Sequence, residues 1–201
     1  PEVISTRLAQ IMLTLQAQGC ANINLVTPSH VVPQILEALA IARGGGLKTP
    51  LVYNTGGYDD MSVLRLLDGI VDIYMPDFKF WQEEESTYLP GITDYAEVAT
   101  EALREMHRQV GDLVIENGVA VRGLLVRHLV MPGDAVNIEA IMSFIASIST
   151  DTYVNVMNQY RPCFRAFDDP KIGAPTTHQD WQRAIRAAKN AGLHRLNGSS
   201  S

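Results

Sequence analysis

Short apolar, β-rich runs alternate with helical segments along the chain, and this alternation constrains the fold more than any other feature. The runs lie at 22–26, 50–54, 71–75, 124–130 and 152–157. Helical periodicity is found between and around them, at 5–18, 31–43, 59–69, 93–111, 138–148 and 177–192. A repeated strand–helix order predicts a parallel sheet with helices outside it. We therefore expect an α/β fold with about five parallel strands, either as an open sheet or as part of a barrel.

The domain organisation is simple. No repeat, coiled coil or linker divides the 201 residues, so we expect a single domain over 1–197 with a flexible tail at 198–201. A short acidic helix is expected over 81–89, and Asn117-Gly118 between two apolar runs predicts a hairpin. The chain opens almost directly into a helix without an initiator Met, so we expect that it begins inside a longer protein.

Composition excludes several classes of partner. The net charge is −6 and no block of Lys or Arg stands out, which argues against duplex nucleic acid and against an anionic membrane surface. No apolar run approaches the ~20 residues that a transmembrane helix needs. Cys20 and Cys163 are far apart and form no CxxC, which fits a reduced, cytoplasmic compartment. We expect both thiols to be buried or half-buried as small apolar groups.

The candidate site lies where the strands end, because ligands of parallel α/β folds bind at the carboxyl ends of the strands. The five exit segments are "TPSH", "NTGGY", "PDFK", "RHLVMPGD" and "NQYRP". Each is polar and several contain Pro or Gly. Strand ends are often polar simply because they reach water, so the pattern alone leaves a site and a solvated rim both open.

Asp77 and Lys79 stand out among these exits. They are two residues apart, so on an extended strand their side chains share one face. Two charges on a half-buried face are costly unless they are paired or hold a ligand. The pair therefore predicts either a local ion pair or a site for a zwitterionic ligand, with Lys79 receiving a carboxylate or hydroxyl and Asp77 an amine.

Other reactions remain open from the residues alone. His30, Asp77 and His128 lie near strand exits and could bind zinc in a metal-dependent hydrolase, although Arg127 and His128 must face opposite ways. We favour Arg127 in the site and His128 on the helix-facing side. Lys79 could form an imine in a Schiff-base lyase. A non-catalytic binding or assembly module is the third alternative.

The order of the motifs resembles that of a known family. The segments "NINLVTPSH", "PLVYNTGGY", "VDIYMPDFKFW", "EMHRQVG", "GLLVRHLVMPG" and "TYVNVMNQYRP" are similar to those of radical S-adenosylmethionine proteins, in the group of pyruvate formate-lyase-activating enzymes. The resemblance covers residues 5–162. It implies about five strands of a (β/α)6 barrel, with the first strand missing from this chain. It also implies S-adenosylmethionine and a [4Fe–4S] cluster as cofactors, whose reaction gives a radical that abstracts hydrogen from a substrate.

The resemblance assigns cofactor contacts to the first two exits. "TPSH" takes the place of a Gly-Gly-Glu segment that meets the amino group of the cofactor, which would put Thr27, Ser29 and His30 nearby without the glycines or the Glu. "NTGG" matches an Asp-Thr-Asn-Gly segment that supports the cofactor. Asn54 and Thr55 are the matching positions, with an amide where the family has a charged ligand.

Further contacts come from the later exits. "MPDFK" matches a Met-x-Asp-x-Lys segment whose acid and base contact the methionine and ribose parts of the cofactor, and Asp77 and Lys79 match it unchanged. Arg127 matches an Arg on the fifth barrel strand. Arg161 stands where the family often has a His near the adenosine.

The cysteine motif CxxxCxxC that binds the cluster in this family is not present. Two cysteines cannot supply its three thiolates, so the cluster ligands are expected upstream, and this chain alone is expected to be inactive. The resemblance allows a protein substrate as well as a small one. A missing first strand would also leave an open sheet edge at which two copies could associate.

Overall fold

Six parallel strands form the central sheet. The structure is a computed structural model that describes residues 4–82, 85, 92–133 and 135–197. Its strands follow one another in the order β1-β2-β3-β5-β6-β7, with β4 paired to β5 outside this path. Their bounds are β1 Ile23–Val26, β2 Leu51–Thr55, β3 Ile73–Pro76, β4 Val114–Glu116, β5 Val119–Leu129, β6 Tyr153–Met157 and β7 Leu196–Asn197. The expected parallel α/β sheet is confirmed, and β7 extends it by one very short strand.

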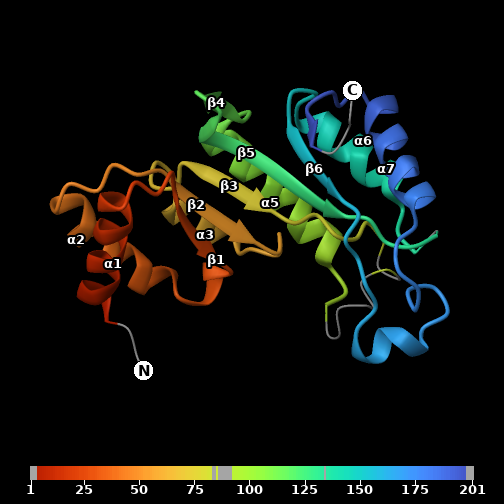
Figure 1. Ribbon diagram of the computed structural model, residues 1–201, viewed down its shortest axis with the longest axis horizontal. Coiled ribbons are helices and arrows are strands. Elements are labelled where there is room, and N and C mark those ends of the chain that lie inside the picture. Colours follow the sequence, from red (N-terminus) through yellow and green to blue (C-terminus); the bar gives the residue numbers. More distant parts are fainter. Residues whose placement is uncertain (1–3, 83–84, 86–91, 134, 198–201) are drawn as a thin grey trace.

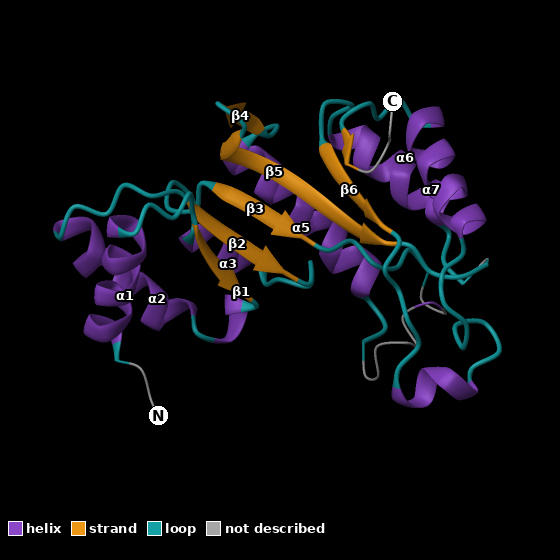
Figure 2. Cartoon of the chain, viewed as in Figure 1, coloured by secondary structure: helices purple, strands orange, loops and turns teal. Residues whose placement is uncertain are grey.

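Helices follow the strands and cover one side of the sheet (Figure 1). Figure 2 shows α1 and α2 grouped beside β1, and α6 and α7 grouped beside β6. The bounds are α1 Ser5–Ala17, α2 Val32–Gly44, α3 Met61–Leu66, α5 Tyr95–Val110, α6 Ile138–Ile148 and α7 His178–Asn190, with 3-10 turns at Pro28–His30 and Phe164–Asp168. The helix expected over 81–89 falls mostly outside the described residues, and so does the tail at 198–201.

The hairpin expected at Asn117-Gly118 is confirmed. Strand β4 pairs antiparallel with the start of β5, and Glu116 faces Val119 across the turn. Both turn residues have positive φ, +50° at Asn117 and +80° at Gly118. A two-residue turn with both φ positive is the type that joins twisted strands without splaying them.

The main core lies between the sheet and the helices. It includes these fully or nearly fully buried side chains from the strands: Tyr53, Tyr74, Leu124, Val126 and Val154. They pack with Leu103, Met106, Ile141 and Ile145 of the helices in one cluster. Burying one such side chain contributes roughly 1.5–3 kcal/mol. This single cluster includes side chains from α2 to α7 and fixes where the strand exits lie.

The opposite face of the sheet is only partly covered. A small apolar cluster of Val52, Ile73 and Leu113 forms its floor. Closer to the exits, Asn54, Met75, Arg127, Asn155 and Met157 are half-buried. Strand β6 shows this as strict alternation between buried and half-buried residues. We call this surface the inner face.

Strand β1 ends the strand order on one side, and its Val26 is 68% exposed. The edge at which self-association was expected is therefore open in the described part of the chain. Pairing of two copies there stays a prediction.

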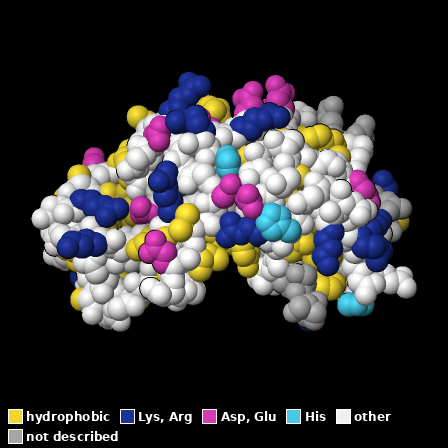
Figure 3. Space-filling model, turned by 90° about the horizontal axis from the view of Figure 1, so that it is seen from above, with side chains coloured by type: hydrophobic (Ala, Val, Ile, Leu, Met, Phe, Trp, Pro, Cys, Tyr) yellow, Lys and Arg dark blue, Asp and Glu magenta, His cyan; other side chains and the backbone are white. Residues whose placement is uncertain are grey.

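The surface shown in Figure 3 carries basic and acidic side chains next to one another. Within the described residues, no helix is both long and apolar enough to cross a membrane.

Candidate functional site

Asp77 and Lys79 emerge together from β3, and Arg127 of β5 joins them. The Asp77 carboxylate accepts a hydrogen bond from Arg127 Nε at 2.8 Å, and Arg127 Nη2 lies 2.7 Å from the same oxygen. Lys79 Nζ lies 3.4 Å from the other oxygen. The side chains of Asp77, Lys79 and Arg127 are 21%, 35% and 23% exposed. One carboxylate thus lies between two cations, which leaves the group a net positive charge.

Asn54 completes this group from β2. Its side-chain oxygen accepts a hydrogen bond from Arg127 Nη2 at 2.8 Å. The guanidinium therefore spans β2 and β3 from its own strand, using the fixed fork of donors that Arg offers. We call Asn54, Asp77, Lys79 and Arg127 the exit cluster.

Backbone pairing explains why these side chains meet. Asp77 N–H donates to Thr55 O at 2.9 Å, and Phe78 N–H donates to Arg127 O at 2.9 Å. The chain thus stays extended past the end of β3, so Asp77 and Lys79 face inward while Phe78 faces the helices. Phe78 is fully buried and stacks on Phe144 with a centroid distance of 5.4 Å. That packing anchors the segment between the two charged residues.

His128 faces the helices, next to Arg127 in sequence but on the other side of the sheet. It is buried, and its Nδ1 donates a hydrogen bond to Phe78 O at 2.8 Å. Burial lowers the pKa of His128 to about 4, so the ring is neutral at physiological pH. It supports the Asp77–Lys79 segment from behind.

A cavity of about 700 Å³ opens beside the exit cluster. One part of its lining is charged and comprises Asp77, Lys79, Arg127 and Arg161. Another part is largely apolar and includes Phe80, Leu129, Met131, Met157, Tyr160 and Ile172. A cavity of this size is typical of small-molecule sites, and its combination of apolar wall and few charged groups is typical as well.

Arg161 and Cys163 reach the cavity from the loop after β6. Both are exposed, and Cys163 Sγ lies 3.7 Å from Arg161 O. Cys20 is also exposed. The expectation that both thiols are buried was therefore wrong. Cys20 lies just beyond α1, and Cys163 lies in a loop that forms a cavity rim instead of packing into the core.

The first exit lies apart from this cavity. Thr27 has φ +50° and begins a 3-10 turn over Pro28–His30. Thr27, Ser29 and His30 are exposed, and none of them lines the cavity. Thr27 N–H donates to Asn54 O at 2.8 Å, so the exit is joined to the exit cluster through the backbone of β2.

Thr55 faces the helix side, where it holds a buried carboxylate. Its hydroxyl donates to Asp59 at 2.6 Å, and the Tyr53 hydroxyl donates to the other oxygen at 3.0 Å. Burial raises the pKa of Asp59, and these two hydrogen bonds partly oppose the rise. Thr55 therefore shapes the loop after β2 and does not line the cavity.

Two residues that the sequence did not single out hold the exits together. The Tyr95 hydroxyl, at the start of α5, contacts the backbone of both the β2 and β3 exits. Gly57 has φ +84°, and a Cβ there would lie 2.2 Å from Asp77 O. The second glycine of "NTGG" could have been noticed as a point of close backbone approach. Nothing local to Tyr95 indicates its role.

The described residues contain no group of three or more His, Cys, Asp or Glu side chains that could hold a metal ion. In particular, His30 is exposed at the β1 exit while His128 is buried behind β5. These two histidines and Asp77 do not converge.

Comparison with known proteins supports the fold. No protein-family model matches the chain. An uncharacterized protein of Methanocaldococcus jannaschii is 29% identical over 174 residues, which is 86% of this chain, and the chain spans about half (47%) of that relative's length. The crystal structure of a domain of pyruvate-formate lyase-activating enzyme from Bacteroides vulgatus superposes with a TM-score of 0.61 at 13% identity. This likeness covers 89% of this chain and 99% of that domain. The chain therefore has the fold of that domain, an open partial barrel of parallel strands.

Proposed function

We propose that this chain is the cofactor-binding part of a radical S-adenosylmethionine enzyme and that its cavity binds S-adenosylmethionine. The observation that carries the proposal is the convergence of Asp77, Lys79 and Arg127 beside one cavity at the carboxyl end of the sheet. The likeness of the fold to a domain of a pyruvate-formate lyase-activating enzyme supports it.

The lining of the cavity fits the chemistry of this cofactor. S-adenosylmethionine carries a carboxylate, an amine and a sulfonium at one end and a flat adenine at the other, joined by a ribose. Lys79 and Arg161 can donate to the carboxylate or to ribose hydroxyls, and Asp77 can accept from the amine. Phe80, Met157 and Tyr160 offer apolar surface on which a base can pack.

The iron–sulfur cluster does not fit the residues of this chain. Two cysteines, Cys20 and Cys163, cannot supply three thiolates, and only Cys163 lines the cavity. The thiolates for such a cluster would have to come from outside the residues of this chain. The contribution of this chain is to bind and orient the cofactor, and alone it would be inactive.

The geometry supports the alternative reactions less well than it supports binding of S-adenosylmethionine. The zinc hydrolase requires His30, His128 and Asp77 to meet, and they lie on different sides of the sheet. The Schiff-base lyase requires Lys79 Nζ to be free to attack a carbonyl, whereas it lies 3.4 Å from the Asp77 carboxylate, with which it forms an ion pair. A non-catalytic module is the outcome if the cavity takes no cofactor.

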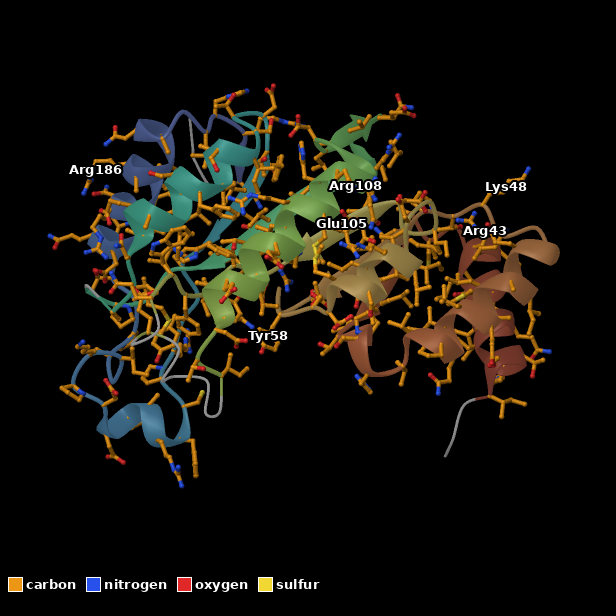
Figure 4. All side chains as sticks on the ribbon, turned by 180° about the vertical axis from the view of Figure 1, so that it is seen from behind. Arg43, Lys48, Tyr58, Glu105, Arg108 and Arg186 are labelled. Carbon is orange, nitrogen blue, oxygen red and sulfur yellow. The ribbon has the colours of Figure 1, made fainter. Side chains whose placement is uncertain are left out.

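Isothermal titration calorimetry of the purified chain with S-adenosylmethionine tests the proposal. Lys79→Ala and Asp77→Ala should each raise the Kd about tenfold or more, because each removes a charged contact. Lys48→Ala is the matched control, since Lys48 is exposed and lies at the far end of the molecule (Figure 4). Absence of binding by the unmodified chain, or equal affinity of all three variants, would contradict the proposal. Borohydride trapping of a carbonyl substrate on Lys79 would instead favour the lyase.

A further inference from the structure

The Tyr95 hydroxyl connects the backbones of the two exits that carry the exit cluster. It accepts a hydrogen bond from Lys79 N–H at 3.0 Å. Its single proton can be donated to Gly56 O at 2.9 Å or to Asp77 O at 3.0 Å. One phenol thus contacts the residue after β2 and two residues of the Asp77–Lys79 segment, and none of these contacts involves a charged side chain.

The ring of Tyr95 is held rigidly. The residue is 1% exposed and begins α5. Phe80 packs on it edge-on at a centroid distance of 5.7 Å, and Tyr58 stacks on it at 6.3 Å. Figure 4 shows Tyr58 beside the start of α5. Because the ring cannot move freely, the position of its hydroxyl fixes the separation of the two exits.

The glycines of the β2 exit bear on how closely it can lie to Tyr95 and to the Asp77–Lys79 segment. A Cβ at Gly57 would lie 3.2 Å from the Tyr95 hydroxyl as well as 2.2 Å from Asp77 O. A Cβ at Gly56 would lie 3.4 Å from Lys79 Nζ. Gly57 therefore lets the β2 exit lie directly against the segment that carries Asp77 and Lys79, whereas at Gly56 a Cβ would make only an ordinary contact with the end of the Lys79 side chain.

We infer that Tyr95 is a positioning residue for the cavity: by tying the β2 exit to Asp77 and Lys79, it sets the geometry in which the exit cluster meets a ligand. The effect on ligand affinity rests on the proposed function. The effect on the backbone of the exits does not, and can be measured without any ligand.

Tyr95→Phe removes the hydroxyl and keeps the ring. We expect it to raise the Kd for S-adenosylmethionine about tenfold, the size of effect that loss of one ordering contact produces. Tyr74→Phe is the matched control, because Tyr74 is also fully buried, lies in β3 and loses one hydrogen bond, to Gln109, on the helix side. It should destabilise the protein similarly and leave the Kd within about twofold of the unmodified value.

A double variant separates positioning from general destabilisation. If Tyr95 acts through Lys79 and its neighbours, the Kd of the Tyr95→Phe/Lys79→Ala double variant should be less than about threefold higher than the Kd of Lys79→Ala alone. A general loss of stability would instead multiply the two effects in full. Full multiplication, or an unchanged Kd in Tyr95→Phe alone, overturns the inference.

Amide hydrogen exchange decides the case in which the unmodified chain binds no S-adenosylmethionine. That result would refute the proposed function but not the role of Tyr95. The Lys79 amide should exchange about tenfold faster in Tyr95→Phe than in Tyr74→Phe, because its acceptor has been removed. Equal exchange rates in the two variants overturn the inference, and faster exchange in Tyr95→Phe supports it.

Discussion

Arg127 and Asp77 face each other across neighbouring parallel strands, joined by a hydrogen bond of 2.8 Å between Arg127 Nε and the carboxylate. The same guanidinium also reaches Asn54 at 2.8 Å. Three strand exits are thus connected through one planar group. A planar fork can make these contacts together, whereas a single ammonium cannot hold the same geometry.

Arg127→Lys should therefore loosen the contacts within the exit cluster and lower the stability of the fold. We expect the free energy of unfolding to fall by about 1–2 kcal/mol, because Asn54 and part of the Asp77 carboxylate lose their donor in a half-buried place. Urea unfolding followed by circular dichroism measures this change. Arg186→Lys, at an exposed position of α7, is the control and should stay within about 0.5 kcal/mol. Equal losses in the two variants would show that the fork is unimportant.

Gly57→Ala should lower the free energy of unfolding more than a Gly→Ala substitution at another position with a positive φ. Gly57 combines φ +84° with a Cβ position 2.2 Å from Asp77 O, so the exits must separate. We expect a loss of about 3 kcal/mol or more in the free energy of unfolding. Gly69→Ala has a similar φ of +75° with no atom near its Cβ and should lose only about 1–2 kcal/mol. The two losses would be equal if the close approach were absent.

Period-two reasoning on the strands predicted much of the candidate site. Asp77, Lys79 and Arg127 meet because parallel strands end at one edge and alternate residues share a face, and both rules are local. The same rule shows why Asn54 and Thr55 differ. Adjacent strand residues face opposite ways, so only Asn54 reaches the inner face and Thr55 reaches Asp59.

The contacts that no local rule predicts depend on distant segments. Tyr95 reaches Gly56 across 39 positions of sequence. Strand β7 has only two residues and forms because the chain returns from α7 alongside β6. The direction of the first exit depends on a positive φ at Thr27, which is uncommon for a β-branched residue and gave no sequence signal.

Phe164→Gly should stabilise the protein although it removes a large side chain. Phe164 has φ +52° and is 82% exposed, so its side chain gains little from burial and its backbone is strained. We expect the free energy of unfolding to rise by about 0.5–1 kcal/mol, measured by thermal and urea unfolding. Phe167→Gly, 65% exposed in the same turn and without a positive φ, should lower it. A loss in both variants would indicate that the Phe164 ring makes a stabilising contact.

His128 should make stability depend on pH below neutrality. Its pKa is about 4 in the folded chain because burial disfavours the charged ring, and about 6.5 when unfolded. Between these values the unfolded state binds more protons, so stability falls as the pH falls. From pH 7 to pH 5 the linkage costs on the order of 2 kcal/mol. His128→Asn keeps an N–H donor for Phe78 O but cannot titrate, so its loss over this range should be smaller by about that amount. Urea unfolding at pH 7, 6 and 5 measures both proteins, and parallel pH profiles would show that His128 takes up a proton without unfolding.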